Sequence, residues 1–417
     1  MSRREPERFK PYEQEQGQLL PSFVAEGLDP SDPVFFINEV VEQMELSAFE
    51  ARYSAIGEHA YPPRLLLKLW LFGVTQGVYS GREIARRLHW DLRFRYLVGS
   101  AGHPDFRTIN RFRVRHAEDF AELLRQTVVL ARGAGMVRLG VVTVDGTKIR
   151  ANTSRHKAMS HGRMVEEEKR LAAEIRAITR HLDEVNAQED RDCGEDDDGG
   201  GGMPKELQDR KARREKIRQL RAQLEAEKGD KLKDRSQKSF ADPDAQMMKN
   251  GDGSLQYSYN AQAAVSHDGL IVAAELTTDA TDAAQLVPMT EAVARTAGEK
   301  PGIVVADKGY LSEAVLEKMN EREQQCLVAT GRERRPDGKW PTKPLSQAMA
   351  RTLRLPWAAQ VYRRRKTQAE RPFAEIKSAM RFRRFSVRGV LKVTGEWGLV
   401  CAGFNLRRLM AAAVAAG

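Results

Sequence analysis

The chain has little of what secreted and membrane proteins contain. Its 417 residues include three cysteines, Cys193, Cys326 and Cys401, which lie far apart and form no CxxC pair. They therefore give no cysteine-based zinc pattern and suit a reducing cytosol. The N-terminal MSRREPERFKPYEQ lacks the apolar core of a signal peptide. The longest apolar run, around 65–74, contains Lys68 and is too short to span a bilayer, so we expect a cytoplasmic protein without a membrane partner.

Acidic residues are the minority charge. Lys and Arg outnumber Asp and Glu by 68 to 58, which gives a net charge of +10. This surplus favours a polyanionic partner, nucleic acid before membrane. Apolar residues make up 41% of the chain, enough for a folded interior. The length exceeds that of one ordinary core and predicts two or three domains.

Residues 1–135 are predicted to form an all-α N-terminal domain. PPRLLLKLWLF suits a buried helix, and SGREIARRLHWDLRFRYL begins with Ser80 and Glu83 at capping-box spacing. In that second stretch Ile84, Leu88 and Leu92 would share one face of a continuous helix. Two basic helices joined by GSAGHPD could bind DNA. The alternative is an ordinary helical bundle with solvated arginines, or a dimerisation domain.

The residues that follow have the pattern of an α/β domain, expected over 136–164 and 236–417. Short β-branched runs bounded by turn residues predict strands. SHDG between two of them contains the Asp-Gly signal of a hairpin. One strand, a hairpin and then strands alternating with helices predict a mixed sheet flanked by helices. The predicted strands are VVTVDGTKI, YSYNAQAAV, LIVAAELTT, GIVVADKGY and QQCLVATG.

A helical hairpin is expected to interrupt this domain at 165–235. Apolar residues alternate steps of four and three in both of its halves, which is a short coiled-coil pattern. The tip, CGEDDDGGGGMP, contains the acidic trio 196–198, which could hold a cation. A solvated loop is the favoured interpretation, because the glycines leave such ligands disordered. The apolar positions are Leu171, Ile175, Ile178, Leu182 and Val185 in the first half and Ile217, Leu220 and Leu224 in the second.

Two aspartates follow buried strands directly. Asp145 comes after VVTV and Asp307 after IVVA. Each alone is more often a turn cap, since VDGT and ADKG both resemble turns. Ligands of open α/β sheets gather at strand ends, however, and paired carboxylates suit hard cations such as Mg²⁺. The pair becomes a candidate metal site if a third carboxylate lies among phosphate-binding groups.

The basic stretch VYRRRKTQAERPFAEIKSAMRFRRFSVRG, at 361–389, contains two glutamates. On a helix, Glu370, Phe373 and Lys377 would share one face, while Glu375 would point elsewhere. Phe373 would press that face toward the sheet and bring Glu370 to the two aspartates. Pro372 is awkward in a helix interior, so we expect the helix to begin near 370 or 371. Displacement at a phosphodiester uses a pair of metal ions ~4 Å apart, which three carboxylates can hold.

Other residues remain alternatives. Asp242, Asp244 and Asp282 flank the predicted hairpin, and each could replace one of the three carboxylates. Asn260 and Gln262 alternate on one strand face, where they could position DNA or a metal-bound water or could simply pack. Trp340 and Trp397 could stack on an unpaired base, although the apolar surroundings of Trp397 favour a core position.

Several motifs resemble the DDE transposases of bacterial insertion sequences, in the branch with a Tyr–Arg–Glu–Lys signature. They are VTVDGTKIRAN, DPDAQMMK with YSYNAQAAV, VVADKGY, YRRRKTQAERPFAEIK, RFRRFSVRG and EWGLVCAGFNLRRL. YPPRLLLKLWLFGV and PDFRTINRFR resemble the N-terminal region of that family. The resemblance implies a ribonuclease-H-like catalytic fold, Mg²⁺ as two ions that Mn²⁺ can replace, and double-stranded DNA as partner.

The resemblance also implies roles for single residues. Asp145, Asp307 and Glu370 would be the catalytic metal ligands. Tyr362, Arg365 and Lys377 would match the other signature residues, which bind DNA near the cut, with Lys366 and Arg381 beside them. The family has three residues between Arg and Glu, whereas four separate Arg365 from Glu370 and Lys366 has the expected spacing.

These expectations predict a transposase that cuts DNA at element ends and joins them to a target. It would act as a homodimer on DNA, in the cytoplasm and at the nucleoid. One rival is a metal-dependent endonuclease without strand transfer. A second rival is a DNA-binding regulator without catalysis.

Overall fold

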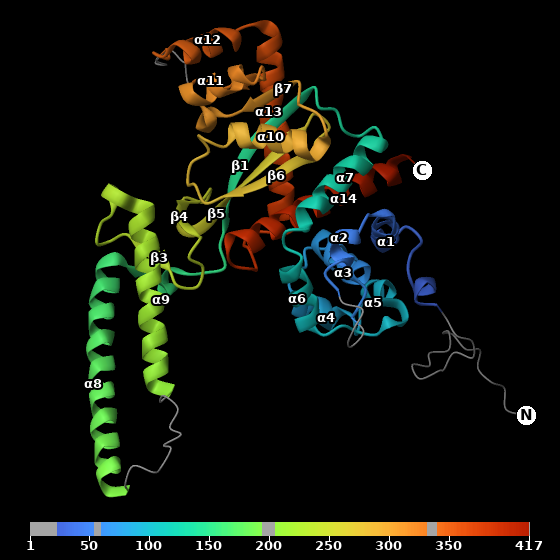
Figure 1. Ribbon diagram of the computed structural model, residues 1–417. Coiled ribbons are helices and arrows are strands. Elements are labelled where there is room, and N and C mark those ends of the chain that lie inside the picture. The colour runs from blue at the N-terminus through green and yellow to red at the C-terminus, as the bar shows by residue number, and fades with distance from the viewer. Residues whose placement is uncertain (1–22, 54–59, 194–204, 332–339, 417) are drawn as a thin grey trace, which may run out of the picture. The chain divides into compact units, whose positions relative to one another are not determined.

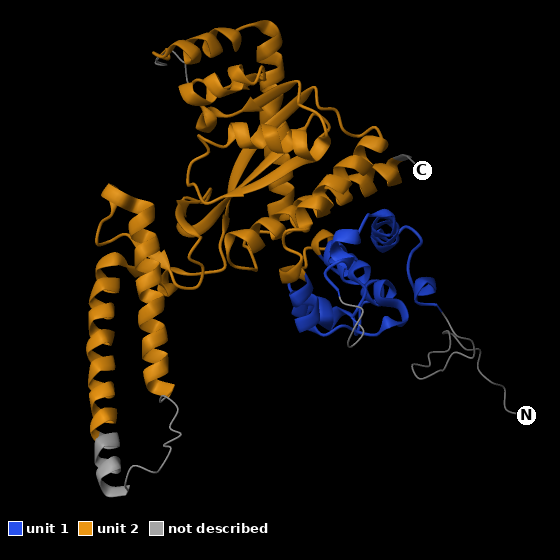
Figure 2. Cartoon of the chain, in the orientation of Figure 1, with its two compact units in different colours: residues 1–73, 80–112 blue, residues 74–79, 113–417 orange. Residues whose placement is uncertain are grey.

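The computed structural model describes residues 23–53, 60–193, 205–331 and 340–416 (Figure 1). The acidic trio 196–198 and the N-terminal MSRREPERFKPYEQ lie outside the described residues. The chain divides into two compact units, coloured separately in Figure 2. Met1–Gly73 with Ser80–Phe112 form unit 1, and Val74–Tyr79 with Arg113–Gly417 form unit 2.

Unit 1 is built from short helices around an apolar interior. The predicted helix at PPRLLLKLWLF is α3, and Leu67, Trp70 and Phe72 on it are fully buried. Trp70 Nε1 donates to the carbonyl of Ile109 at 3.0 Å, which ties α3 to α6. The helices are η1 (Val24–Gly27), α1 (Pro33–Gln43), α2 (Ser47–Glu50), α3 (Pro63–Thr75), α4 (Gly81–Arg87), α5 (Leu92–Val98), η2 (Gly99–Ala101) and α6 (Phe106–Arg115), of which α3 and α6 run on into unit 2.

The single helix expected after Ser80 is wrong, because the stretch forms two helices, α4 and α5. Ser80 does cap α4, and its Oγ accepts the Glu83 backbone N–H at 3.4 Å. Asp91 then caps α5 by accepting the Arg93 N–H at 3.1 Å. An Asp side chain that bonds a nearby backbone N–H competes with the continuing helix and starts a new one. Leu92 is consequently 38% exposed and lies off the buried Ile84 face.

Unit 2 is organised around a six-stranded mixed sheet of order β4-β5-β1-β7-β8, with β6 also paired to β5. β1 is antiparallel to β5 and parallel to β7, and β8 is parallel to β7. The predicted mixed α/β architecture is confirmed, although the short edge strand β4 was not expected. The strands are β1 (Val141–Arg150), β4 (Gln246–Lys249), β5 (Leu255–Ser266), β6 (Ile271–Thr277), β7 (Ile303–Ala306) and β8 (Gln325–Val328).

Helices cover both faces of this sheet. Val142 and Val144 of β1 are buried in a core with residues of α7, α10 and α11, while α13 packs along β1 from the other face. α14 is long and apolar enough to cross a membrane, but more than half of it is buried, and it packs on α7 and β6 as a core helix does. The helices are α7 (Phe120–Gly133), α10 (Leu286–Ala297), α11 (Glu313–Glu321), α12 (Pro344–Thr352), α13 (Pro356–Ser378) and α14 (Val390–Ala416).

The expected start of the helix near 370 is wrong. α13 begins at Pro356, where proline needs no N–H partner, and continues through Pro372. An interior proline removes one helical hydrogen bond. Here Pro372 is buried beside Ala369, Phe373 and Ile376 on the face that packs inward.

α8 (His161–Cys193) and α9 (Lys205–Lys228) lie where the sequence predicts a helical hairpin. Cross-helix ion pairs join Glu174 to Arg210 and Glu168 to Arg221, a register that only antiparallel helices can have. Met164, Leu171, Ile217 and Leu220 form its small apolar core. Two short strands, β2 (Ala158–Ser160) and β3 (Gln237–Ser239), pair at its base.

Candidate active site

The two predicted aspartates lie at one level of the sheet. β1 and β7 are parallel, and Thr143 pairs with Val305. Two residues further along each strand this register reaches Asp145 and Asp307. Asp307 ends β7 and caps the short helix η5 (Lys308–Tyr310), and its Oδ1 accepts the Gly309 N–H at 2.7 Å. The structure thus brings together two carboxylates that are far apart in sequence.

Asp145 occupies a site that is short of positive charge. Its side chain is 18% exposed. Burial, followed by the charges of Asp307 and Asp282, raises the pKa of Asp145 to about 6. The Gly146 N–H at 2.9 Å and Arg365, whose Nη1 lies 3.6 Å from Asp145 Oδ2, oppose this rise without cancelling it. A cation at these oxygens would relieve the repulsion.

α13 packs on the Asp145 side of β1. Thr143 Oγ1 donates to Gln368 Oε1 at 3.0 Å, and Lys377 Nζ donates to Thr147 Oγ1. Side chains two apart share a strand face, so the residues on either side of Asp145 on this face both contact α13. Phe373 is buried, as predicted, and stacks on Trp397 with ring centroids 6.4 Å apart.

The two glutamates of α13 lie on different sides of the helix. Glu370 is exposed, and Lys377 follows it seven positions, or two helical turns, along the chain, which places both on one edge. Glu375 lies elsewhere, with Oε1 3.6 Å from Arg407 Nε of α14. In the part of the chain that the structure describes, no three His, Cys, Asp or Glu side chains form a closed metal-ligand group. Asp145 and Asp307 are therefore gathered, while Glu370 is not joined to them.

The predicted DNA-binding residues of α13 also differ in their surroundings. Arg365 is partly buried and faces Asp145, and its guanidinium lies 5.9 Å from the Tyr362 ring centroid. Lys366, which has the family spacing, is exposed. Arg381 follows α13 on the surface with a positive φ of 58°, a conformation uncommon outside glycine.

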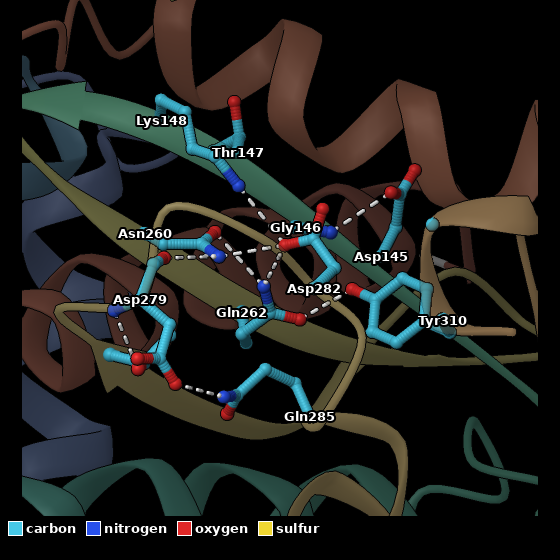
Figure 3. Close-up of polar contacts among 12 residues, drawn as sticks. Asp145, Gly146, Thr147, Lys148, Asn260, Gln262, Asp279, Asp282, Gln285 and Tyr310 are labelled. Atoms are coloured by element: carbon cyan, nitrogen blue, oxygen red, sulfur yellow. Dashed lines mark hydrogen bonds and ion pairs between the residues drawn. The ribbon is translucent and has the colours of Figure 1, made fainter. Parts of the chain in front are cut away.

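A polar cluster lies beside the aspartate pair, and its centre is Asp282 (Figure 3). Asp282 Oδ1 accepts hydrogen bonds from Lys148 Nζ at 3.0 Å, Asn260 Nδ2 at 2.7 Å and Gln262 Nε2 at 2.8 Å. Tyr310 in turn donates to Gln262 Oε1. Both amides are fully buried, so they hold Asp282 rather than reach DNA. The alternation of Asn260 and Gln262 along one strand was the sequence signal for this cluster, but it did not reveal their common partner.

The cluster accounts for two glycines next to the aspartates. A Cβ at Gly146 would lie 2.2 Å from Gln262 Nε2 and 2.9 Å from Asp282 Oδ1. A Cβ at Gly309 would lie 2.9 Å from Asp307 Oδ1. Any side chain at either position would displace the groups that set the site.

The remaining alternatives have structural roles. Asp242 Oδ1 accepts the Gly389 N–H at 3.1 Å, and Asp244 Oδ2 accepts the Val390 N–H at 2.8 Å, so both satisfy the start of α14. Trp397 is fully buried, as favoured, and Nε1 donates to the Gln262 carbonyl at 3.0 Å. Trp340 is the exception, since it is 36% exposed, with the Arg354 guanidinium 4.3 Å from its ring centroid.

A cavity of about 590 Å³ in unit 2 does not belong to this site. It lies at the β8 edge between α11 and α12, and Cys326, Met349 and Trp357 help to line it. The aspartate pair lies instead between β1, β7 and α13.

Comparison with known protein families gives two matches along the chain. Residues 208–406 match the family described as Transposase DDE domain, and residues 23–115 match the Transposase domain (DUF772). Asp307 and Glu370 lie inside the first match, and Asp145 precedes it. No curated protein and no solved structure was found to match the chain. Two transposase family models thus match separate parts of one chain, each over less than half of it, and both matches favour a DDE transposase.

Proposed function

We propose that this transposase cuts DNA at the ends of its insertion sequence and joins the freed ends to target DNA. The observation that carries the proposal is the placement of Asp145 level with Asp307 on adjacent parallel strands, in a chain that matches transposase families. A central β1 with β5 and β6 antiparallel on one side and β7 and β8 parallel on the other supports a ribonuclease-H-like core.

Asp145, Asp307 and Glu370 would hold Mg²⁺, as two ions that Mn²⁺ can replace. The fit rests on the chemistry of the donors: carboxylate oxygens are the ligands that Mg²⁺ prefers, and the crowding at Asp145 leaves uncompensated negative charge. When bound, such ions polarise the phosphodiester and stabilise the attacking and leaving oxygens. Asp282 would support the site by accepting hydrogen bonds from Gln262 and Lys148, which hold both side chains in place.

The cations of α13 would hold the DNA strand. Lys377, fixed by Thr147 two residues beyond Asp145, would bind a phosphate next to the cut. Arg365 would orient Asp145 in the free protein and turn to a phosphate when DNA arrives, since Arg binds carboxylate and phosphate through the same fork. Tyr362 would pack beside it, and the exposed Lys366 and Arg381 would contact the backbone further out.

The partner would be double-stranded DNA, both element ends and target, and the acting form a homodimer, because two ends must be cut in concert. We place the protein in the cytoplasm and at the nucleoid, without a membrane partner. The function is tested by incubating it with Mg²⁺, a duplex carrying the terminal repeat of its element, and a target plasmid. Joined products support the proposal, cut ends without joining favour the endonuclease, and binding without cutting favours the regulator.

A further inference from the structure

The turn between α13 and α14, residues 379–389, has apolar and basic side chains that differ in burial. We call it the arginine turn. Its apolar residues are buried and its arginines are exposed. The buried side chains therefore anchor the turn, and the arginines give it a positively charged surface. The buried side chains are Met380, Phe382, Phe385 and Val387, and the exposed ones are Arg381, Arg383, Arg384 and Arg388.

A buried carboxylate holds the backbone of the turn. Glu396 of α14, which is 2% exposed, accepts the N–H groups of Ser386 at 2.8 Å and Val387 at 3.3 Å. Arg113 Nη1 balances this charge at 3.1 Å from Glu396 Oε1. Removing either partner would leave an uncompensated buried charge. The shape of the turn is therefore set before any ligand arrives.

Three arginines of the turn each donate their Nε–H to a backbone carbonyl. Arg383 Nε donates to the Lys377 carbonyl at 3.0 Å, Arg384 Nε to the Ala151 carbonyl at 3.3 Å, and Arg388 Nε to the Asn152 carbonyl at 2.8 Å.

These bonds leave the outer nitrogens of the guanidinium groups available, apart from one contact between Arg384 Nη2 and Asn152 Oδ1 at 3.1 Å. Among the described residues, no carboxylate pairs with an arginine of the turn. Solvated surface arginines need no such fixation, whereas a preorganised guanidinium loses less entropy when it binds a phosphate.

The arginine turn continues the surface that starts at Asp145. Phe385 N–H donates to the Arg150 carbonyl at 2.9 Å, so the turn adjoins the end of β1. A strand rises about 3.3 Å per residue, which puts Thr147 about 7 Å and Arg150 about 17 Å beyond Asp145. Phosphates of one DNA strand follow at about 3.4 Å along the axis. If the duplex axis runs along β1, the phosphates about two to five nucleotides from the cut lie over the stretch from Lys377, whose carbonyl holds Arg383, to Arg150, where the turn adjoins β1.

We propose that the arginine turn binds the phosphates that lie about two to five nucleotides from the one that is cut. The position of the cut, from which these nucleotides are counted, rests on the proposed function. The binding of DNA by the turn does not. Burial and the charge of Arg383 lower the pKa of Lys377. This shift is expected where positively charged side chains lie close together, as they do at a binding site for an anion.

The first test compares two double variants on a fluorescent duplex of unrelated sequence. Arg383→Gln/Arg388→Gln removes two charges from the turn. Arg295→Gln/Arg322→Gln removes two from helices elsewhere in unit 2, where these arginines pair with Glu275 and Glu291. Each lost phosphate contact lowers the slope of log affinity against log salt by about 0.9. We expect the turn variant to lose about 1.8 and the control less than 0.5, with unchanged thermal unfolding in both. Equal losses in the two variants, or no loss in the turn variant, would overturn the proposal.

The second test places the contacts on the DNA. Methylphosphonates, which are neutral, replace single phosphates in a terminal-repeat duplex, and binding is measured with Ca²⁺. A methylphosphonate at positions two to five from the cut should weaken DNA binding by the parent about tenfold and leave DNA binding by the turn variant unchanged. A loss of binding that occurs only at other positions would overturn the assigned positions. If the turn variant shows the lower salt slope and the parent never cuts, the DNA surface stands and the proposed function fails. If the parent cuts and the turn variant keeps its slope, the function stands and this inference fails.

Discussion

Asp145 on β1 stands level with Asp307 at the end of β7, because the parallel register of the two strands runs without a shift from Val141 and Ile303. Two acidic side chains are thereby held close in a partly buried place, with one arginine 3.6 Å from Asp145. This arrangement is unfavourable for folding at neutral pH and favourable for binding a cation.

Asp145→Asn should stabilise the protein at pH 8. The pKa of Asp145 is about 6 in the fold, against an ordinary value of 3.8. The raised pKa favours folding fully below pH 3.8, and this contribution is lost as the pH rises through about 6. Asparagine avoids the buried charge, so its gain at pH 8 is at most about 3 kcal/mol and should fade between pH 6 and 4. Urea unfolding at pH 8 and 4.5 measures it.

Asp268→Asn supplies the control with the opposite sign. Hydrogen bonding from Arg138 lowers the pKa of Asp268. Its contribution to stability is therefore present above the unfolded pKa and lost as the pH falls through the folded one. This variant should be less stable than the parent at pH 8, by about 1 kcal/mol. A destabilised Asp145→Asn at pH 8 would show that the aspartate pair is not under repulsion.

Mg²⁺ should raise the melting temperature at pH 8 without DNA, since an ion that binds only the folded state stabilises it. At tenfold excess over the dissociation constant the gain is about 1.4 kcal/mol, or ~3 °C for a unit of this size. At pH 5 the gain should shrink, because protons compete for Asp145. Calorimetric scans of the parent, Asp307→Asn and Asp268→Asn measure this. An equal rise in Asp307→Asn would place the ion elsewhere.

Lys377→Ala should weaken DNA binding and lower the salt slope by about one. Lys377 is held by Thr147 on the same strand face as Asp145, where a phosphate would replace or join the hydroxyl. Fluorescence anisotropy over a range of salt concentrations gives the slope, with Lys318→Ala on α11 as the control. A slope that equals that of the parent would mean that Lys377 serves only the packing of α13 on β1.

The helical hairpin should be dispensable for folding of the sheet. Its apolar core, Met164 with Leu171, Ile217 and Leu220, is separate from the main core of unit 2. We expect a variant with a short Gly/Ser linker in place of 165–229 to keep a cooperative thermal transition. Loss of folding would contradict this. Folding without DNA cleavage would assign the hairpin to binding or to the pairing of ends.

Most of the sheet could be predicted from the sequence because its strands are β-branched runs between turns. Asp307 could be singled out because it ends such a run. The expected strand end at Asp145 is wrong, because β1 continues through Asp145 to Arg150 and Asp145 pairs with Ala263 of β5. Local pattern could not tell that Asp91 would start a new helix, or that α13 would pass through Pro372, since tertiary packing decides both. Neither could it show that Asp282, Asn260 and Gln262 meet, because the strand register and the path of the loop after β6 bring them together.

The residue spacing along α13 also does not predict which of its side chains faces Asp145. The signature spacing favours Lys366, yet Arg365 is the residue that faces Asp145. A long flexible side chain can reach the site from a position that helical geometry alone would not select. Glu370 and Glu375 were separated correctly onto different sides of the helix, since the seven-residue spacing of two turns is robust.

The central claim is most directly tested by a cleavage time course and a gel shift on Asp145→Asn, Asp307→Asn, Glu370→Gln and Glu375→Gln, with a terminal-repeat duplex and Mg²⁺. The first three should lose cleavage by orders of magnitude while they bind DNA as well as the parent or more tightly, because a negative charge near the phosphate is gone. Glu375→Gln, which loses only its pairing with Arg407, should cut within a few-fold of the parent. Ca²⁺ should permit binding without efficient cutting, since it takes a larger and looser coordination shell. Active Glu370→Gln together with inactive Glu375→Gln would contradict the assignment of the third carboxylate, and full cleavage by Asp145→Asn or Asp307→Asn would contradict the site itself.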